Sequence, residues 1–93
     1  MKIINDIYKG AVRCITAETE GTCSYAIELK LVGDEILDIE FHGGCSGNLK
    51  GIAALCRGQK VDSIRKTLKG ITCGSKKTSC PDQLSQLLQK ISE

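Results

Sequence analysis

Cysteine is the residue type in this sequence with the most chemistry to offer, and the chain has six of them in 93 residues. Thiolates bind metals and act as nucleophiles, and paired thiols cycle between dithiol and disulfide. Four fall in loops or at the ends of predicted elements, where they can reach a shared site: Cys23, Cys45, Cys73 and Cys80. We expect Cys14 and Cys56 to sit inside regular elements, facing the core, as small hydrophobes.

Two of the four cysteines are predicted at helix N-termini. The segment 42–48, HGGCSGN, lies between a strand-like alternation and a helical period, which puts Cys45 at the corner. Cys80 opens the last helix, where Ser79 and Asp82 fit a capping box. Unpaired N–H groups of a first helical turn favour a thiolate. We therefore expect two activated thiols, with Cys80 on the buried side of its helix.

A hairpin is predicted to bring Cys23 to Cys45. Alternating apolar residues predict strands over 25–31 and 37–42, joined by a turn at 33–35. A three-residue loop matches the apolar faces by opposing these pairs: Leu31 with Leu37, Leu29 with Ile39, and Ile27 with Phe41. Continued outward, this register sets Cys23 opposite Cys45 with Cβ atoms roughly 4.5–5.5 Å apart. A bulge near Gly43 would break the extrapolation.

The remaining periodicities predict one further strand and three helices. The strand covers 7–16, interrupted or entered at Gly10, with Val12 and Cys14 on one face and Arg13 on the other. The helices run from about 46 to 57, from about 61 to 70, and from about 79 onward, and Cys56 falls on the apolar stripe of the first. The order predicts one α+β domain over 1–93, a small antiparallel three-stranded sheet with helices packed on one face.

The composition of the chain argues against several classes of function. The net charge is +2, no basic block occurs and aromatic residues make up 3% of the chain, so nucleic acid is not an expected partner. No apolar run approaches a membrane span, and residues 1–6 lack the apolar core of a signal peptide. We expect a cytoplasmic protein, where cysteines serve as ligands or catalytic thiols more often than as disulfides.

Several chemistries remain open for the four cysteines. They suffice for a tetrahedral zinc site or an iron–sulfur cluster, although no CxxC pair is present. A thiol-redox pair is an alternative, either Cys73 with Cys80 or Cys23 with Cys45. A single nucleophilic cysteine with His42 as its base is another. The plainest alternative is that these are ordinary buried cysteines that never meet.

The segment Thr78-Ser79-Cys80-Pro81-Asp82 resembles the signature of the four-cysteine TSCPD-domain family. The segments 44–49 and 70–74 and the pair Cys23-Ser24 extend the resemblance, which covers roughly residues 20–90. It implies metal binding through Cys23, Cys45, Cys73 and Cys80. TSCPD domains also occur at the C-terminus of adenosylcobalamin-dependent ribonucleotide reductases, so the resemblance implies an association with ribonucleotide reductase or another protein partner.

A more distant resemblance is to the U-type iron–sulfur scaffold proteins, onto whose pattern fall Cys23, Cys45 and Cys80. The scaffold's acidic residue is here Tyr25, its histidine is Ser79, and Cys73 is extra. These departures imply that this chain holds its metal centre more tightly than a scaffold protein does. We expect a metal-binding module that holds zinc, or alternatively an iron–sulfur cluster. The rival is a cluster carrier or a thiol-redox protein that passes electrons to a partner such as ribonucleotide reductase. Catalysis by this chain alone is not expected.

Overall fold

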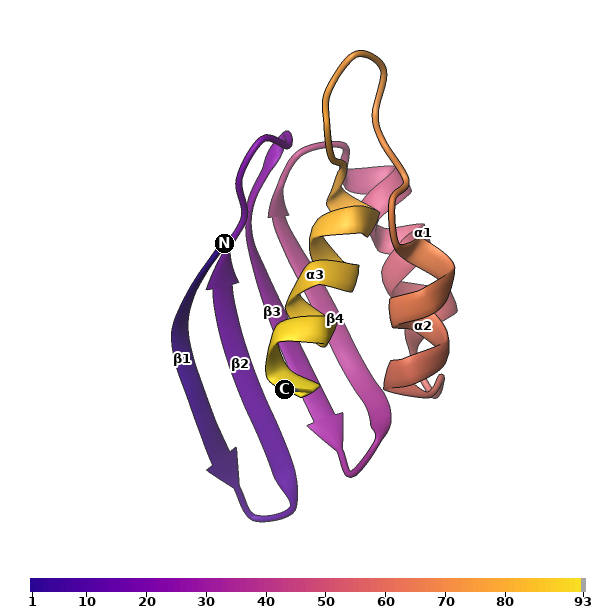
Figure 1. The fold of residues 1–93 in the computed structure, drawn as a ribbon. Helices are drawn as coiled ribbons and strands as arrows, with labels where there is room; N and C mark the ends of the chain where they lie inside the picture. Colours follow the sequence, from indigo (N-terminus) through magenta and orange to yellow (C-terminus); the bar gives the residue numbers. More distant parts are fainter. Residues whose placement is uncertain (93) are drawn as a thin grey trace.

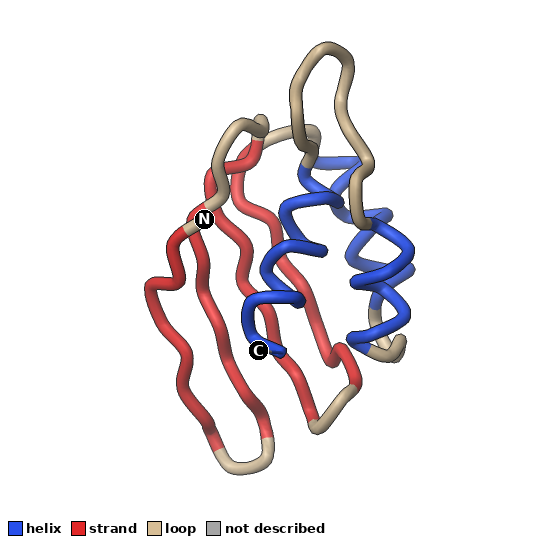
Figure 2. Tube along the Cα trace, in the orientation of Figure 1, coloured by secondary structure: helices blue, strands red, loops and turns tan. Residues whose placement is uncertain are grey.

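The computed structural model describes residues 1–92 as a four-stranded sheet with three helices on one side (Figures 1 and 2). The sheet is antiparallel, in the order β1-β2-β3-β4. The strands are β1 Lys2–Lys9, β2 Val12–Glu18, β3 Ser24–Val32 and β4 Glu35–Gly43. The helices are α1 Ser46–Cys56, α2 Val61–Leu68 and α3 Cys80–Ser92. The α+β class, the antiparallel sheet and the three helices are confirmed.

The sheet has four strands, and the prediction of three was wrong. The segment 7–16, expected to be one strand, contains the tight turn between β1 and β2, with Gly10 at φ +63°. Tyr8 pairs with Arg13 across this turn, and Lys9 pairs with Val12. Most of β1 is exposed. Its residues therefore lack the polar–apolar alternation that marks a half-buried strand.

Cys14 is also placed differently from the prediction. Ile15 and Ala17 are buried on the helix side of β2, and Arg13 shares their face. Cys14 lies on the open face and is half-buried, opposite Ile7 of β1. The arginine tolerates the helix side because its guanidinium bonds the Asp6 carboxylate through two nitrogens, at 2.8 and 2.6 Å. Because the ion-paired Arg13 occupies the helix side of β2, Cys14 faces away from the core, and its predicted orientation was wrong.

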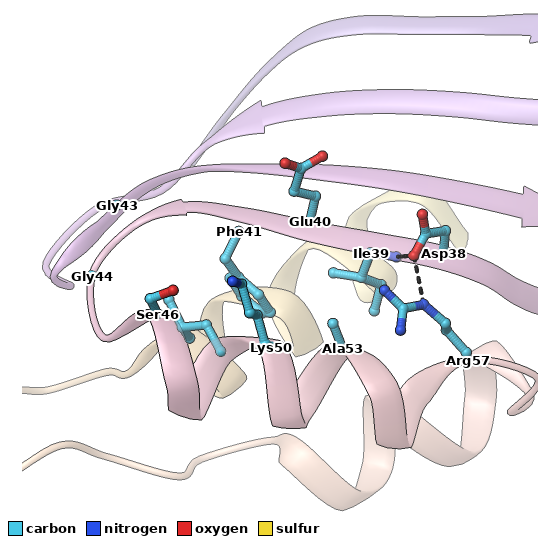
Figure 3. Close-up of a pocket in the computed structure, with 11 residues that line it drawn as sticks. Asp38, Ile39, Glu40, Phe41, Gly43, Gly44, Ser46, Lys50, Ala53 and Arg57 are labelled. Atoms are coloured by element: carbon cyan, nitrogen blue, oxygen red, sulfur yellow. Dashed lines mark hydrogen bonds and ion pairs between the residues drawn. The ribbon is translucent and has the colours of Figure 1, made fainter.

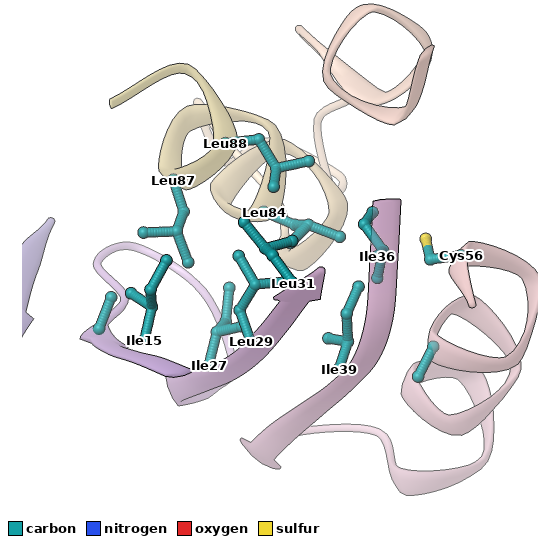
Figure 4. Packing of buried hydrophobic residues seen from close by; sticks show 12 residues of the cluster. Ile15, Ile27, Leu29, Leu31, Ile36, Ile39, Cys56, Leu84, Leu87 and Leu88 are labelled. Carbon is teal, nitrogen blue, oxygen red and sulfur yellow. The ribbon is translucent and has the colours of Figure 1, made fainter. Parts of the chain in front are cut away.

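The core lies between the inner face of β2–β4 and the helices α1 and α3 (Figure 4). Leu84, Leu87 and Leu88 of α3 are fully buried against strand residues such as Ile27 and Leu29. Cys56 of α1 is 3% exposed in this cluster, as its place on the apolar stripe predicts. Burial raises the pKa of the Cys56 thiol, which keeps it neutral. Cys56 is therefore a core residue.

The β3–β4 hairpin keeps the predicted register only in its middle. Leu29 pairs with Ile39 and Ile27 with Phe41, as expected. Nearer the turn, Leu31 pairs with Ile36 because Leu37 is the extra residue of a bulge. The bulge buries Ile36 and leaves Leu37 49% exposed. The predicted pairing of Leu31 with Leu37 was wrong, since a two-residue turn at Gly33-Asp34 combines with the bulge.

Candidate metal centre

The four predicted cysteines come from four separate points of the chain to one end of the molecule. Cys23 precedes β3, Cys45 is the N-cap of α1, Cys73 lies in the long loop before α3, and Cys80 is the first residue of α3. All four line a single cavity of about 570 Å³. The three connecting segments gather at the upper end of the fold in Figure 1. Cys80 is buried, and the other three are exposed.

The cavity has mainly apolar walls around the thiols. One wall is α1, which contributes Leu49, Ile52 and the 77% exposed Leu55. Ile71 and Pro81, on either side of the loop that carries Cys73, also line the cavity. An apolar surrounding controls the access of water to a metal–thiolate site. The surroundings of the cysteines are therefore suited to thiolates that bind a metal.

A second bulge changes how Cys23 approaches Cys45. Tyr25 is the extra residue on β3, so that Ser24 pairs with Gly43. The predicted opposition of Cys23 to Cys45 was therefore wrong by one position, and Gly44 lies beside Cys23 instead. A Cβ on Gly44 would come within 3.1 Å of the Ser24 nitrogen. Gly44 also has φ +77°, so both its backbone conformation and its surroundings favour glycine.

The four cysteines line one cavity, but their sulfurs do not form a closed cluster. Among residues 1–92, no three cysteine sulfurs lie within 4.8 Å of one another. Four thiolates on one zinc ion would be roughly 3.8 Å apart, given a Zn–S distance of about 2.3 Å. Binding of one ion by all four requires the sulfurs to approach further. Cys23, Cys45 and Cys73 are exposed and lie outside the core, so such movement displaces no core side chain.

Cys80 has the most elaborate surroundings of the four. Its Sγ lies 3.0 Å from the Oγ of Ser24, which is itself 3% exposed. Burial alone would raise the pKa of the Cys80 thiol. Hydrogen bonds from the Ser24 hydroxyl and N–H, the Thr22 hydroxyl and the Cys23 thiol outweigh burial and lower that pKa. Cys80 is buried, as predicted. Its pKa is lowered by groups of residues 22–24, whereas the prediction relied on the N–H groups of the first turn of the helix.

The start of α3 ties down the loop that carries Cys73. The Asp82 carboxylate accepts hydrogen bonds from the Gly70 N–H at 2.7 Å and the Thr78 hydroxyl at 2.5 Å. The Ser79 hydroxyl accepts the Asp82 N–H at 3.1 Å and donates to the Ile71 carbonyl at 2.6 Å. The predicted capping box is thus half confirmed: Ser79 caps Asp82, but the Asp82 carboxylate holds the loop. Both ends of the loop are fixed to one helix.

A family model described as the TSCPD domain matches residues 6–92. The chain belongs to the TSCPD-domain family. The five residues of the signature, Thr78 to Asp82, are those that supply the buried thiol and anchor the loop. No curated protein and no solved structure matches the chain. No helix within residues 1–92 of this TSCPD domain is long and apolar enough to cross a membrane.

Sequence reasoning missed a second group of ligand-type side chains in this TSCPD domain. Glu28, Glu40 and His42 bring one ligand atom each to within 4.8 Å of one another on the open face of the sheet. The His42 Nε2 lies 2.8 Å from the Glu28 carboxylate. Glu28 and Glu40 are paired across the hairpin, so the predicted register already implied their contact. His42 is thus engaged by Glu28, which removes support for its role as a base for Cys45.

The groove between β4 and α1 is a further cavity, of about 500 Å³ (Figure 3). Arg57 lies across it and bonds the Asp38 carboxylate at 2.7 Å. The hydrogen bond from Arg57 lowers the pKa of Asp38, so that the pair stays charged. No cysteine or histidine lines this groove. The cysteine cavity is therefore the better candidate for chemistry.

Proposed function

We propose that this TSCPD domain is a metal-binding module that holds one metal centre through Cys23, Cys45, Cys73 and Cys80. The observation that carries the proposal is their convergence on one cavity from four points of the chain. The two remaining cysteines are elsewhere, since Cys56 is in the core and Cys14 is on the open face. Four thiolates are a complete donor set for zinc or for an iron–sulfur cluster.

Zinc is the metal we favour, with an iron–sulfur cluster as the alternative. In a U-type scaffold arrangement, an acid and a histidine would accompany three cysteines. Tyr25 stands in the acid's place, and its side chain is 66% exposed. Ser79 stands in the histidine's place, and its hydroxyl is used to cap α3 and to hold Ile71. A fourth thiolate from Cys73 therefore completes the set, which suits a permanent site. A bound zinc ion would cross-link the loops and stabilise the fold.

The setting we propose is the cytoplasm, where thiols stay reduced. The proposed partner is ribonucleotide reductase or another protein that contacts the cysteine end of the molecule. The family resemblance supports this choice. The exposed Leu55 and Ile71 beside the cysteines are consistent with a contact surface there.

Thiol-redox transfer is the second candidate, and one observation favours it. The Cys23 thiol is one of the groups whose hydrogen bonding lowers the pKa of Cys80, and both thiols line the same cavity. An activated thiol next to a second thiol is the arrangement in which a disulfide forms. The redox pair that this observation supports is Cys23 with Cys80, which differs from the two pairings suggested by the sequence.

Metal analysis with a visible spectrum, on protein purified without oxygen, separates these functions. About one zinc per chain and no colour supports the tetrathiolate zinc site. Iron with sulfide and visible absorption supports a cluster. Absence of metal, with two thiols that oxidise reversibly, contradicts the metal module and supports the redox pair. Cys14→Ser is the matched control, because its thiol is on the open face and its metal content should equal that of the natural protein.

A further inference from the structure

Ser24 is a buried polar residue next to the four-cysteine site. Its side chain is 3% exposed, and its Oγ lies 3.0 Å from the Cys80 Sγ, within hydrogen-bonding distance for sulfur. The Thr22 hydroxyl lies 3.2 Å from the same Oγ. The Ser24 hydroxyl is therefore enclosed between the β2–β3 loop and the start of α3, with the Cys80 sulfur as its partner across the fold.

The bulge at Tyr25 is what turns Ser24 toward the cysteine. Directly paired residues share a face of the sheet, and Ser24 pairs with Gly43. Gly43 is two residues after Phe41 on β4, so the two residues share a face of the sheet. Phe41 packs against the core on the helix side. With the register of the middle strand and no bulge, Ser24 would have followed Glu28 to the open face. The extra residue thus delivers a hydroxyl to Cys80.

The direction of the hydrogen bond follows from the chemistry of sulfur. A thiolate has no proton and can only accept, so the Ser24 hydroxyl must donate when Cys80 is a thiolate. Hydrogen bonds to a ligating atom fix its orientation and tune its electron donation to a metal. The Ser24 hydroxyl therefore holds the Cys80 sulfur in one orientation.

We propose that Ser24 is a positioning residue of the four-cysteine site, whose hydroxyl donates to the Cys80 sulfur and raises the affinity of the site for its metal. This inference rests on the proposed metal-binding function. Ser24 is not a ligand, because the hydroxyl faces the sulfur and acts through it. The class of metal it serves is a thiophilic divalent ion such as zinc.

The test compares Ser24→Thr with Ser24→Val, two side chains of equal shape that differ in the hydroxyl. Zinc affinity is measured by competition with a chromogenic chelator, and Co²⁺ is used as a spectroscopic probe of the sulfur ligands. We expect the valine variant to bind zinc at least about tenfold more weakly than the threonine variant. Its sulfur-to-cobalt charge-transfer band should move to longer wavelength, because the sulfur lone pair has lost a proton donor.

Ser85→Ala is the control for the loss of a buried hydroxyl elsewhere. Ser85 is 2% exposed and donates to the Arg65 carbonyl at 2.6 Å, at a distance from the cysteines along α3. Its variant should keep the natural zinc affinity and cobalt spectrum. Equal zinc affinity and an identical band in the threonine and valine variants would overturn the role of Ser24 while leaving the metal site intact. Failure of the natural protein itself to bind either ion would instead overturn the four-cysteine function, and this inference with it.

Discussion

At the scale of single residues, the six cysteines divide by surroundings rather than by spacing. Cys80 is buried among hydrogen-bond donors from residues 22–24, which lower its pKa. Cys56 is buried among apolar side chains, which raise its pKa. The thiol groups of Cys80 and Cys56 therefore have opposite protonation preferences. A charged thiol is stabilised at the cavity, whereas a neutral one is stabilised in the core.

Single serine substitutions at all six cysteines should reproduce this division. Serine at Cys23, Cys45, Cys73 or Cys80 should weaken zinc binding, since a hydroxyl is a poor zinc ligand. Cys56→Ser should retain the metal but lose about 1–3 kcal/mol of stability, because it buries a hydroxyl among apolar groups. Chelator competition and urea unfolding measure the two effects. Equal metal retention in all six variants contradicts the assignment.

The sequence predicted the environment of Cys56 and not that of Cys14. Cys56 belongs to a helical stripe with Leu49 and Ala53, and several positions at a helical spacing agree on its face. Cys14 had one apolar neighbour on its face in the predicted strand, namely Val12. The decisive contact was the Asp6–Arg13 pair, which joins two strands through a turn that the alternation did not reveal.

At the scale of elements, the N-terminus of α3 organises the candidate site. It supplies the Cys80 thiol, and through Asp82 and Ser79 it fixes both ends of the loop that carries Cys73. The Asp82 carboxylate is buried, and burial alone would raise its pKa. Hydrogen bonds from Thr78, Gly70 and Gln86 outweigh burial and lower the pKa. The carboxylate is therefore charged in the folded protein and stabilises the loop.

Asp82→Asn should lower the free energy of unfolding at pH 7 by about 1–3 kcal/mol, because a charged acceptor of several hydrogen bonds is lost. A lowered folded-state pKa gives stability that is fully present above the ordinary carboxyl pKa of about 4 and is lost as the pH falls through the lowered value. The deficit of the variant should therefore shrink at acidic pH.

Urea unfolding at pH 7 and at pH 3 measures this dependence. The control is Asp62→Asn, whose carboxylate pairs with Arg65 and Lys66 in solvent and should contribute little. An Asp82→Asn deficit that is unchanged or larger at low pH would show that the charge of Asp82 does not stabilise the loop.

Gly44 shapes the corner between β4 and α1, where its backbone is left-handed. Gly44→Ala should destabilise the fold by about 1–2 kcal/mol through its left-handed backbone. A further cost comes from contacts of 3.0 Å with Leu49 and 3.1 Å with Ser24. Gly10→Ala has φ +63° with no atom within 4 Å of the new Cβ, so it isolates the backbone cost. Equal melting temperatures of the two variants would contradict the close approach at Gly44.

The hairpin shows where prediction from alternation stops. Alternation fixed the pairs Leu29–Ile39 and Ile27–Phe41, because one face there is fully buried. It could not place the extra residues at Tyr25 and Leu37. A bulge costs little at a strand end, and its position depends on tertiary contacts of Ser24 and Ile36 that the local pattern does not contain.

At the scale of the whole molecule, the sheet separates two surfaces. The helices cover one face of the sheet, while the other face is open (Figure 1). Glu28, Glu40 and His42 lie on the open face. The cysteines gather at one end, where three connecting segments meet. A chain of 93 residues buries a modest core. A metal that cross-links these segments would add stability that the core alone does not supply.

Zinc should therefore raise the melting temperature of the metal-free protein. A ligand at a hundred times its Kd contributes about 2.7 kcal/mol, which corresponds to roughly 10 °C or more for a domain of this size. A chelator should reverse the shift, and Cys45→Ser should reduce it. Differential scanning calorimetry measures it. A zinc-dependent shift that survives in Cys45→Ser but is lost in His42→Ala would place the ion on the open face instead.

The central claim, that four cysteines hold one metal centre, is tested most directly by X-ray absorption at the edge of the metal that the purified protein contains. The account predicts a first shell of four sulfur atoms at about 2.3 Å from the metal. Protein without bound metal, or a shell dominated by nitrogen and oxygen, would contradict it.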